Sequence, residues 1–238
     1  MNLNTPFWRE RVFQLVLIMT GLFVLLTAVG MLIYPGGSVH NPQQAGYAFF
    51  QNFFSDLGIT RAHNGQPNWP AAALFFVALN GAGVGLILFF VAFRQFFGRT
   101  RLGWWLSLLG SAVGVLAGVC FVGIAFTPAN LLRPAHIWFV LYAFQSLLLA
   151  SLLYGAAILY ERSYPARLGL IFGLFIIVLG GYVYLLRAGP GLGTPEGAII
   201  QAVGQKIVVY TAVATIMIQA WGAQRLNGRA GHPASGQA

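Results

Sequence analysis

The chain has 238 residues, of which 58% are hydrophobic and only 7% are charged. A soluble domain carries about 25% charged residues, so these charges are too few to cover a globule of this length in water. A disordered chain would be poor in apolar residues. The formal net charge is +9, but nucleic-acid binding needs cations clustered on one polar face, and here they lie between apolar runs. The composition predicts an integral membrane protein with no nucleic-acid partner.

Six apolar runs follow one another along the chain, each long enough for a membrane-spanning helix, which takes about 20 mostly apolar residues. The runs are residues 12–34, 71–93, 104–126, 136–160, 168–186 and 199–221. They are continuous rather than alternating with period two, which excludes a lipid-facing barrel. The sequence therefore predicts an all-α membrane protein, a six-transmembrane-helix bundle over residues 1–226, followed by a flexible cytoplasmic tail over residues 227–238.

Positively charged residues are distributed unevenly between the two sides of the predicted bundle. Nine arginines fall on one side (Arg9, Arg11, Arg94, Arg99, Arg101, Arg162, Arg167, Arg225 and Arg229) and three on the other (Arg61, Arg133 and Arg187). Lys and Arg are enriched on the cytoplasmic side of membrane proteins. Both termini are therefore predicted to be cytoplasmic, in a multi-pass protein of the cell membrane, and specifically of a prokaryotic inner membrane.

The first connection, residues 35–70, is much longer than the others and is predicted to lie on the outer face. Loops longer than about 12–15 residues are usually functional or disordered. This one is rich in aromatic side chains, which should seek the bilayer interface or a groove between helices: Tyr47, Phe49, Phe50, Phe53, Phe54 and Trp69. We therefore expect an ordered outer loop that covers the end of the bundle, with an amphipathic or re-entrant segment over residues 44–57.

Lys206 is the most informative single residue, because it lies inside the sixth apolar run. A lysine at the centre of a membrane helix costs about 2.5–3.5 kcal/mol on insertion scales. Its ammonium group should therefore face the bundle interior and meet Asp56, Glu196 or a bound anion. The alternative is that the side chain snorkels towards the outer headgroups.

Other polar residues are predicted to share a wet, outward-facing pocket with Lys206. Asp56 is the only aspartate of the chain, and its alternative role is to cap a helix or to pair with Arg61 or Arg133. His136 opens the fourth run close to the outer surface. The predicted ligand-binding residues are Asp56, Asn80, His136, Gln205 and Lys206.

The same outer region contains residue types used in catalysis and metal binding. Ser55, Asp56 and His136 supply the side chains of a Ser-His-Asp hydrolase, although adjacent Ser and Asp residues seldom aim at one histidine. Histidine and aspartate are also zinc ligands, but the sequence contains no HxxxH, HxxH or HxH pair. We therefore expect no metal site and no cofactor, and we keep Ser55, Asp56 and His136 as candidate catalytic residues.

Four short motifs lie along the chain: Tyr34-Pro35-Gly36-Gly37, Asn52-Phe53-Phe54-Ser55-Asp56-Leu57-Gly58, Gly123-Ile124-Ala125-Phe126-Thr127-Pro128 and Pro134-Ala135-His136. They resemble motifs of a prokaryotic six-helix integral membrane family that is catalogued as a domain of unknown function. Their Ser-Asp-Leu-Gly and Pro-x-His elements are the more distinctive parts. More distantly, the chain is similar to DRAM-type membrane proteins. The resemblance implies the six-helix fold; where an acidic-basic pair is expected in the last helix, this chain has Gln205 and Lys206.

The sequence as a whole predicts a polytopic membrane protein with an outward-facing polar pocket that binds a lipid-like or amphipathic ligand, so that membrane lipids are its expected partners. One alternative is an accessory subunit of a larger membrane protein complex, with the aromatic first loop and glycine-lined helices as contact surfaces. The glycines of the third run, Gly110, Gly114 and Gly118, are assigned to helix packing. The other alternative is a membrane-embedded hydrolase that acts on lipid headgroups.

Overall fold

The computed structural model describes residues 3, 5–161 and 164–231, the last three as backbone only. Its six long helices are α1 (Val12–Ile33), α2 (Trp69–Phe93), α3 (Arg101–Ala125), α4 (Arg133–Glu161), α5 (Ala166–Ala188) and α6 (Pro195–Gly231). A π-helical turn, η1 (Phe7–Arg11), precedes α1, and two short 3-10 segments, η2 (Phe54–Gly58) and η3 (Arg94–Phe96), lie in the connections. The described residues form no β-strand, only isolated bridges within the first connection.

The six long helices are apolar enough, over a sufficient length, to cross a membrane. A continuous apolar run takes this form because backbone N–H and C=O groups in lipid must pair within their own segment. The prediction of an all-α bundle of six apolar helices is therefore confirmed, and the chain is a polytopic membrane protein.

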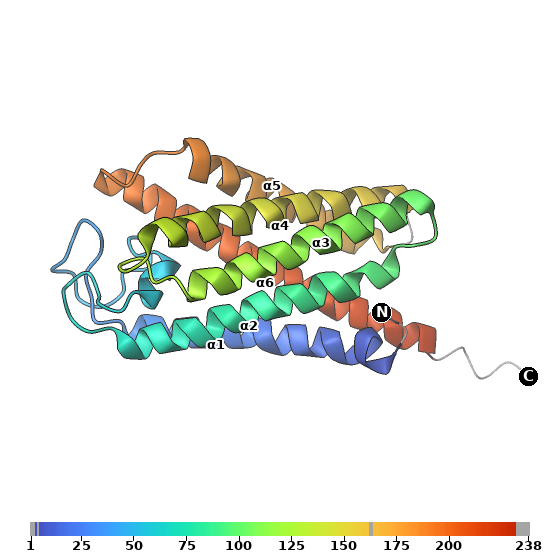
Figure 1. Cartoon of the computed structure of the whole chain (residues 1–238), viewed down its shortest axis with the longest axis horizontal. Helices are drawn as coiled ribbons and strands as arrows, with labels where there is room; N and C mark the ends of the chain where they lie inside the picture. The colour runs from blue at the N-terminus through green and yellow to red at the C-terminus, as the bar shows by residue number, and fades with distance from the viewer. Residues whose placement is uncertain (1–2, 4, 162–163, 232–238) are drawn as a thin grey trace, which may run out of the picture.

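The long helices lie side by side along one axis (Figure 1). Each of α1 to α4 packs against the next, and α6 packs against both α1 and α5. The connection between α1 and α2, residues 34–68, lies at the end of the bundle opposite to the start of α1 and the end of α6 (Figure 1). We call this connection the cap, its end of the bundle the cap end, and the opposite end the terminal end.

Glycines let α3 approach α2 and α4 closely. A Cβ atom on Gly114 would lie 2.2 Å from the ring of Phe90, and one on Gly110 would lie 2.9 Å from the ring of Tyr154. At Gly118 the obstacle is the backbone oxygen of Gly83, at 2.7 Å. The predicted packing role of this glycine stripe is confirmed. Because α2 and α4 occupy it, the stripe is not available to a partner protein.

The terminal half of the bundle is packed solidly around aromatic rings. Phe93, Tyr154 and Phe172 are fully buried in one continuous cluster. Two of the polar groups there bond to each other: the hydroxyl oxygens of Ser111 and Tyr154 lie 2.6 Å apart, and Ser111 donates to the carbonyl oxygen of Phe90 at 2.7 Å. The hydroxyl of Ser151, about one turn before Tyr154 on α4, is buried without a hydrogen-bond partner.

The helix α6 continues to Gly231, five residues into the segment predicted to be a flexible tail. Asn227 is buried there, and its amide donates to the backbone oxygen of Arg9 and, at 3.2 Å, to Oε1 of Gln95. These bonds attach Asn227 to η1 and η3, and the helix continues through residues 227–231. Residues 232–238 of the predicted tail lie outside the described residues.

Candidate functional site

The cap begins with a glycine turn that reverses the chain directly after α1. Gly36 and Gly37 have φ values of 131° and 81°, which side-chain-bearing residues rarely adopt. Space is also restricted, since a Cβ atom on Gly37 would lie 2.4 Å from the backbone nitrogen of Asn64. The turn thereby brings the two ends of the cap together over the end of the bundle.

Asn52 connects the parts of the cap through its side-chain amide, which is completely buried. Its Nδ2 donates to the backbone oxygen of Gly37 at 2.8 Å and to Oδ2 of Asp56 at 2.9 Å. Its Oδ1 accepts from Nε2 of Gln44 and from the backbone N–H of Ala48, both at 3.0 Å. Such a fully bonded amide fixes the fold of the segment around it.

Asp56, which was predicted to bind ligand or to act in catalysis, has its carboxylate directed into the cap. Oδ2 accepts from Asn52 and from the backbone N–H of Phe53 at 2.9 Å, which caps the short helix η2. Oδ1 lies 3.2 Å from Nε2 of His63. The residue therefore takes the capping role that the sequence left as an alternative, while neither predicted arginine partner forms an ion pair with it among the described residues.

Lys206 is buried and faces the interior, so its side chain does not snorkel. Its ammonium group donates to the backbone oxygen of Asn52. It also lies over three aromatic rings of the cap, 5.2 Å from the centre of Phe49, 5.4 Å from Tyr47 and 5.7 Å from Phe54. Ring faces and a carbonyl oxygen thus supply the negative potential that was expected from a carboxylate; neither Asp56 nor Glu196 lies within salt-bridge distance of it in the described structure.

The ring of Tyr47 also ties the cap together through its hydroxyl group. That group donates to the backbone oxygens of Asn52 and Phe53, at 3.2 and 2.9 Å. Burial, with a contribution from the charge of Asp56, raises the pKa of the Tyr47 phenol. The hydroxyl therefore stays protonated and remains a donor at physiological pH.

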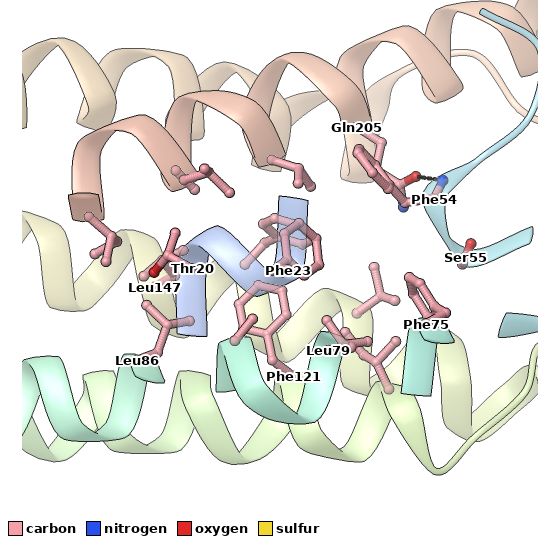
Figure 2. Close-up of a pocket in the computed structure, with 18 residues that line it drawn as sticks. Thr20, Phe23, Phe54, Ser55, Phe75, Leu79, Leu86, Phe121, Leu147 and Gln205 are labelled. Atoms are coloured by element: carbon pink, nitrogen blue, oxygen red, sulfur yellow. Dashed lines mark hydrogen bonds between the residues drawn. The ribbon is translucent and has the colours of Figure 1, made fainter. Parts of the chain in front are cut away.

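Beneath η2 the bundle contains a cavity of about 100 Å³, shown in Figure 2. Its walls come from every long helix except α5, together with η2, and are almost entirely apolar. The lining extends along α6 from Gln205 to Ile216 and along α2 from Phe75 to Leu86. At 1.5 Å per residue each stretch is about 16 Å long, so the cavity is narrow and runs parallel to the helices.

Gln205 stands at the end of this cavity nearest the cap and joins the two structures (Figure 2). Its Oε1 accepts the backbone N–H of Phe54 at 2.7 Å. The first residue of η2 is therefore bonded to a residue more than two helical turns from the start of α6. This is the position that a re-entrant segment would take. Of the five predicted ligand-binding residues, only Gln205 lines the cavity.

His136 lines a second, much smaller recess of about 10 Å³ beside the cavity, and Ser55 lines both. Nδ1 of His136 lies 2.6 Å from the backbone oxygen of Thr127. The recess is at the lower limit for one water molecule. The structure thus brings Ser55 and His136 to a common recess but gives the carboxylate of Asp56 other partners, so the three candidate catalytic residues do not form a hydrogen-bonded triad.

Asn80 lies apart from the other predicted site residues. Its side-chain amide donates to the backbone oxygen of Phe76, one turn earlier on α2, at 2.8 Å. The residue does not line the cavity. No group of three His, Cys, Asp or Glu side chains suited to a metal ion occurs within the part of the chain that the structure describes.

Sequence reasoning missed Asn52, Asn68 and most of the cavity lining. Asn68 is buried and its amide donates to the backbone oxygens of Leu57 and Ile59, at 3.0 and 2.8 Å. Asparagines between aromatic residues were a usable signal, because a buried amide must find partners. The cavity lining gave none, since its side chains are of the same types as those that face lipid.

Comparison of the chain with models of known families, with curated proteins and with solved structures finds no match. The resemblance based on the Ser-Asp-Leu-Gly and Pro-x-His elements therefore stays a prediction. The function is inferred below from the geometry of the cap and the cavity.

Proposed function

We propose that this polytopic membrane protein binds a lipid-like, amphipathic ligand, whose alkyl part occupies the cavity beneath the cap. The observation that carries the proposal is the shape and polarity of this cavity: it is narrow, apolar and parallel to the helices, and it ends at polar residues beside the cap. Membrane lipids are the expected source of such a ligand. The site proposed here is an apolar cavity with one polar end, whereas the sequence predicted a wet, polar pocket.

The energetics of the cavity favour an occupant. Cavity-creating substitutions cost about 24 cal/mol per Å³, so an empty cavity of about 100 Å³ destabilises the bundle by about 2 kcal/mol. A methylene chain in van der Waals contact with the walls would recover part of that free energy. Water would not, because an apolar cavity offers it too few hydrogen-bond partners.

The proposal includes an orientation for the protein, with both termini in the cytoplasm and the cap on the outer face of a prokaryotic inner membrane. The nine-to-three distribution of arginines supports it. The cap would then separate the cavity from the outer aqueous phase, and the ligand would come from the surrounding bilayer.

Native mass spectrometry of the protein extracted with its own lipids tests the proposal. We expect the wild-type chain to retain a lipid, and Ala82→Phe, which places a ring in the cavity, to retain at least tenfold less. The ring should also raise the stability of the delipidated protein by about 1 kcal/mol, as cavity-filling substitutions commonly do. Ala82 lines the cavity on α2.

Ala73→Phe is the matched control, because Ala73 lies on the same helix, is exposed and does not line the cavity. It should retain the lipid and leave stability within about 0.5 kcal/mol of wild type. A wild-type protein without bound lipid, or an Ala82→Phe variant that carries as much as wild type, would contradict the proposed function.

A second candidate function, as an accessory subunit, is favoured by the open side of α5. A Cβ atom on Gly173, Gly180 or Gly181 would meet nothing within 4 Å, so another helix has room to approach closely there. The same mass spectra distinguish the two functions, since a stoichiometric protein partner in place of a lipid supports the subunit.

A further inference from the structure

Two hydrogen-bond donors at the cap end of the cavity have no partner. Gln205 is 8% exposed, and while its Oε1 accepts from Phe54, its Nε2 makes no hydrogen bond within the described residues. The hydroxyl group of Ser55, the residue after Phe54, likewise has no hydrogen bond there and lines the same cavity. An amide N–H that borders an apolar cavity and has no acceptor leaves a hydrogen bond unmade, so this end of the cavity is suited to a ligand oxygen.

The opposite end of the cavity offers no free donor. Thr20 is the polar side chain there, and its hydroxyl donates to the backbone oxygen of Val16 at 2.7 Å. Leu86 and Leu147 surround it (Figure 2). The cavity therefore has one polar end, at the cap, and one apolar end, deep in the bundle.

No charged side chain of the described residues lines the polar end of the cavity. Lys206 is adjacent to Gln205 in sequence, but its ammonium group is bonded to the oxygen of Asn52 and enclosed by the cap rings. Asp56 is adjacent to Ser55, but its oxygens are taken by Asn52, the Phe53 N–H and His63. An ionised headgroup would be buried here without a counter-charge, which is far costlier than burying a neutral oxygen.

We propose, on the basis of the proposed function, that the ligand is an uncharged alkyl lipid with an oxygen acceptor at its head, such as a long-chain alcohol or an acylglycerol. The head oxygen accepts from Nε2 of Gln205 and from the hydroxyl of Ser55. The alkyl chain extends from there towards Thr20. The cavity thus selects by the neutrality of the head and not by a charge that would attract a phospholipid or a fatty acid.

Equilibrium binding of tritiated 1-dodecanol to the full chain in phosphatidylcholine nanodiscs tests this inference, with empty nanodiscs correcting for partition into the bilayer. Unlabelled 1-dodecanol should displace the label, while dodecane, dodecanoate at pH 8 and dodecyltrimethylammonium should each compete at least tenfold more weakly. These probes have chains of equal length and differ in the head alone.

Two variants locate the head. Gln205→Glu keeps an acceptor for the Phe54 N–H but replaces the free amide donor, and it should weaken dodecanol binding at pH 8 about tenfold or more. Ser55→Ala leaves the Phe54 bond untouched and should weaken it three- to tenfold. Asn80→Asp is the matched control, because Asn80 bonds only within α2 and lies outside the cavity; its binding should equal that of wild type.

The outcomes separate this inference from the proposed function. Equal competition by dodecanol and dodecanoate, or by dodecanol and dodecane, would overturn the neutral-head inference and leave a lipid cavity in place. Unchanged dodecanol binding by both Gln205→Glu and Ser55→Ala would overturn the assigned position of the head. No saturable binding of any twelve-carbon probe would contradict the proposed function itself.

Discussion

The terminal and cap halves of the bundle are both built from apolar helices, yet they are packed differently. In the terminal half, buried rings such as Phe93 and Tyr154 fill the interior, and glycines of α3 bring the backbones into contact. In the cap half, residues of α1, α2, α3, α4 and α6 line a cavity of about 100 Å³, and the cap lies over the end of the bundle. The two regions thus differ in how completely the side chains fill the space between the helices.

The hydrogen bonding of two polar sites also differs. Near the terminal end, the hydroxyl of Tyr154 is bonded to Ser111 and to the oxygen of Phe90 at 3.2 Å. Near the cap end, Gln205 and Ser55 line the cavity and keep donors without a hydrogen-bond partner among the described residues. Substitutions that fill, empty or loosen each half should therefore have effects of different sign and size.

The largest effect on stability is expected for Gly114→Val, in the terminal half. Its side chain would collide with Phe90, since a Cβ atom there lies 2.2 Å from the ring. We expect a loss of about 3 kcal/mol or more in the free energy of unfolding, or a failure to fold, measured by thermal denaturation in detergent. Gly173→Val is the control on an open helix face and should change stability by about 0.5 kcal/mol at most. If both substitutions changed the free energy of unfolding equally little, the terminal half would be less tightly packed than described.

The second effect concerns the attachment of the cap by Lys206. Replacing it with methionine removes the hydrogen bond to Asn52 and the attraction of the three rings. We expect Lys206→Met to lower the free energy of unfolding by about 2 kcal/mol, while Arg187→Met, at an exposed position of α5, should have little effect. A neutral or stabilising Lys206→Met, measured in the same detergent, would show that the buried ammonium group contributes nothing to holding the cap.

The smallest effect is a local one, expected for Asp56→Asn. The amide keeps the size of the side chain but turns one acceptor into a donor that faces other donors, at a cost of about 1–2 kcal/mol. Hydrogen exchange followed by mass spectrometry should show faster exchange in residues 34–68 and unchanged exchange around Tyr154. Glu196→Gln, an exposed acid at the start of α6, serves as the control. Faster exchange in both halves would mean that cap and core unfold together.

The sequence predicted the helices well because membrane helices depend on length and composition. It also predicted that Lys206 faces inwards, since the cost of a charge in lipid is a local property of its helix. It did not predict the partner of Lys206, because the carbonyl of Asn52 is positioned by the turn at Gly37 and by bonds between distant parts of the cap. Those contacts are set by the tertiary fold of the cap.

The cavity was beyond prediction for a different reason. In a water-soluble protein, the polar face of a helix marks the side that is exposed to water, and the apolar face marks the side that packs on the core. The helices here are apolar on all sides, so that Phe75, which lines the cavity, and Phe76, which is exposed, are the same residue type in neighbouring positions. Polar side chains at interior positions, Thr20 on α1 and Gln205 on α6, were the available signal for the inner face.

One consequence follows from the continuity of α6. The helix carries Gln205 and Lys206 near one end and Asn227 near the other, without a break between them. The separation from Gln205 to Asn227 is about 33 Å at 1.5 Å per residue, more than the roughly 30 Å hydrocarbon thickness of a bilayer. Because the helix is unbroken, a change of its tilt at the cap end would also move Asn227, whose amide donates to the backbone oxygen of Arg9. One unbroken helix thus links the cap end of the bundle to its terminal end.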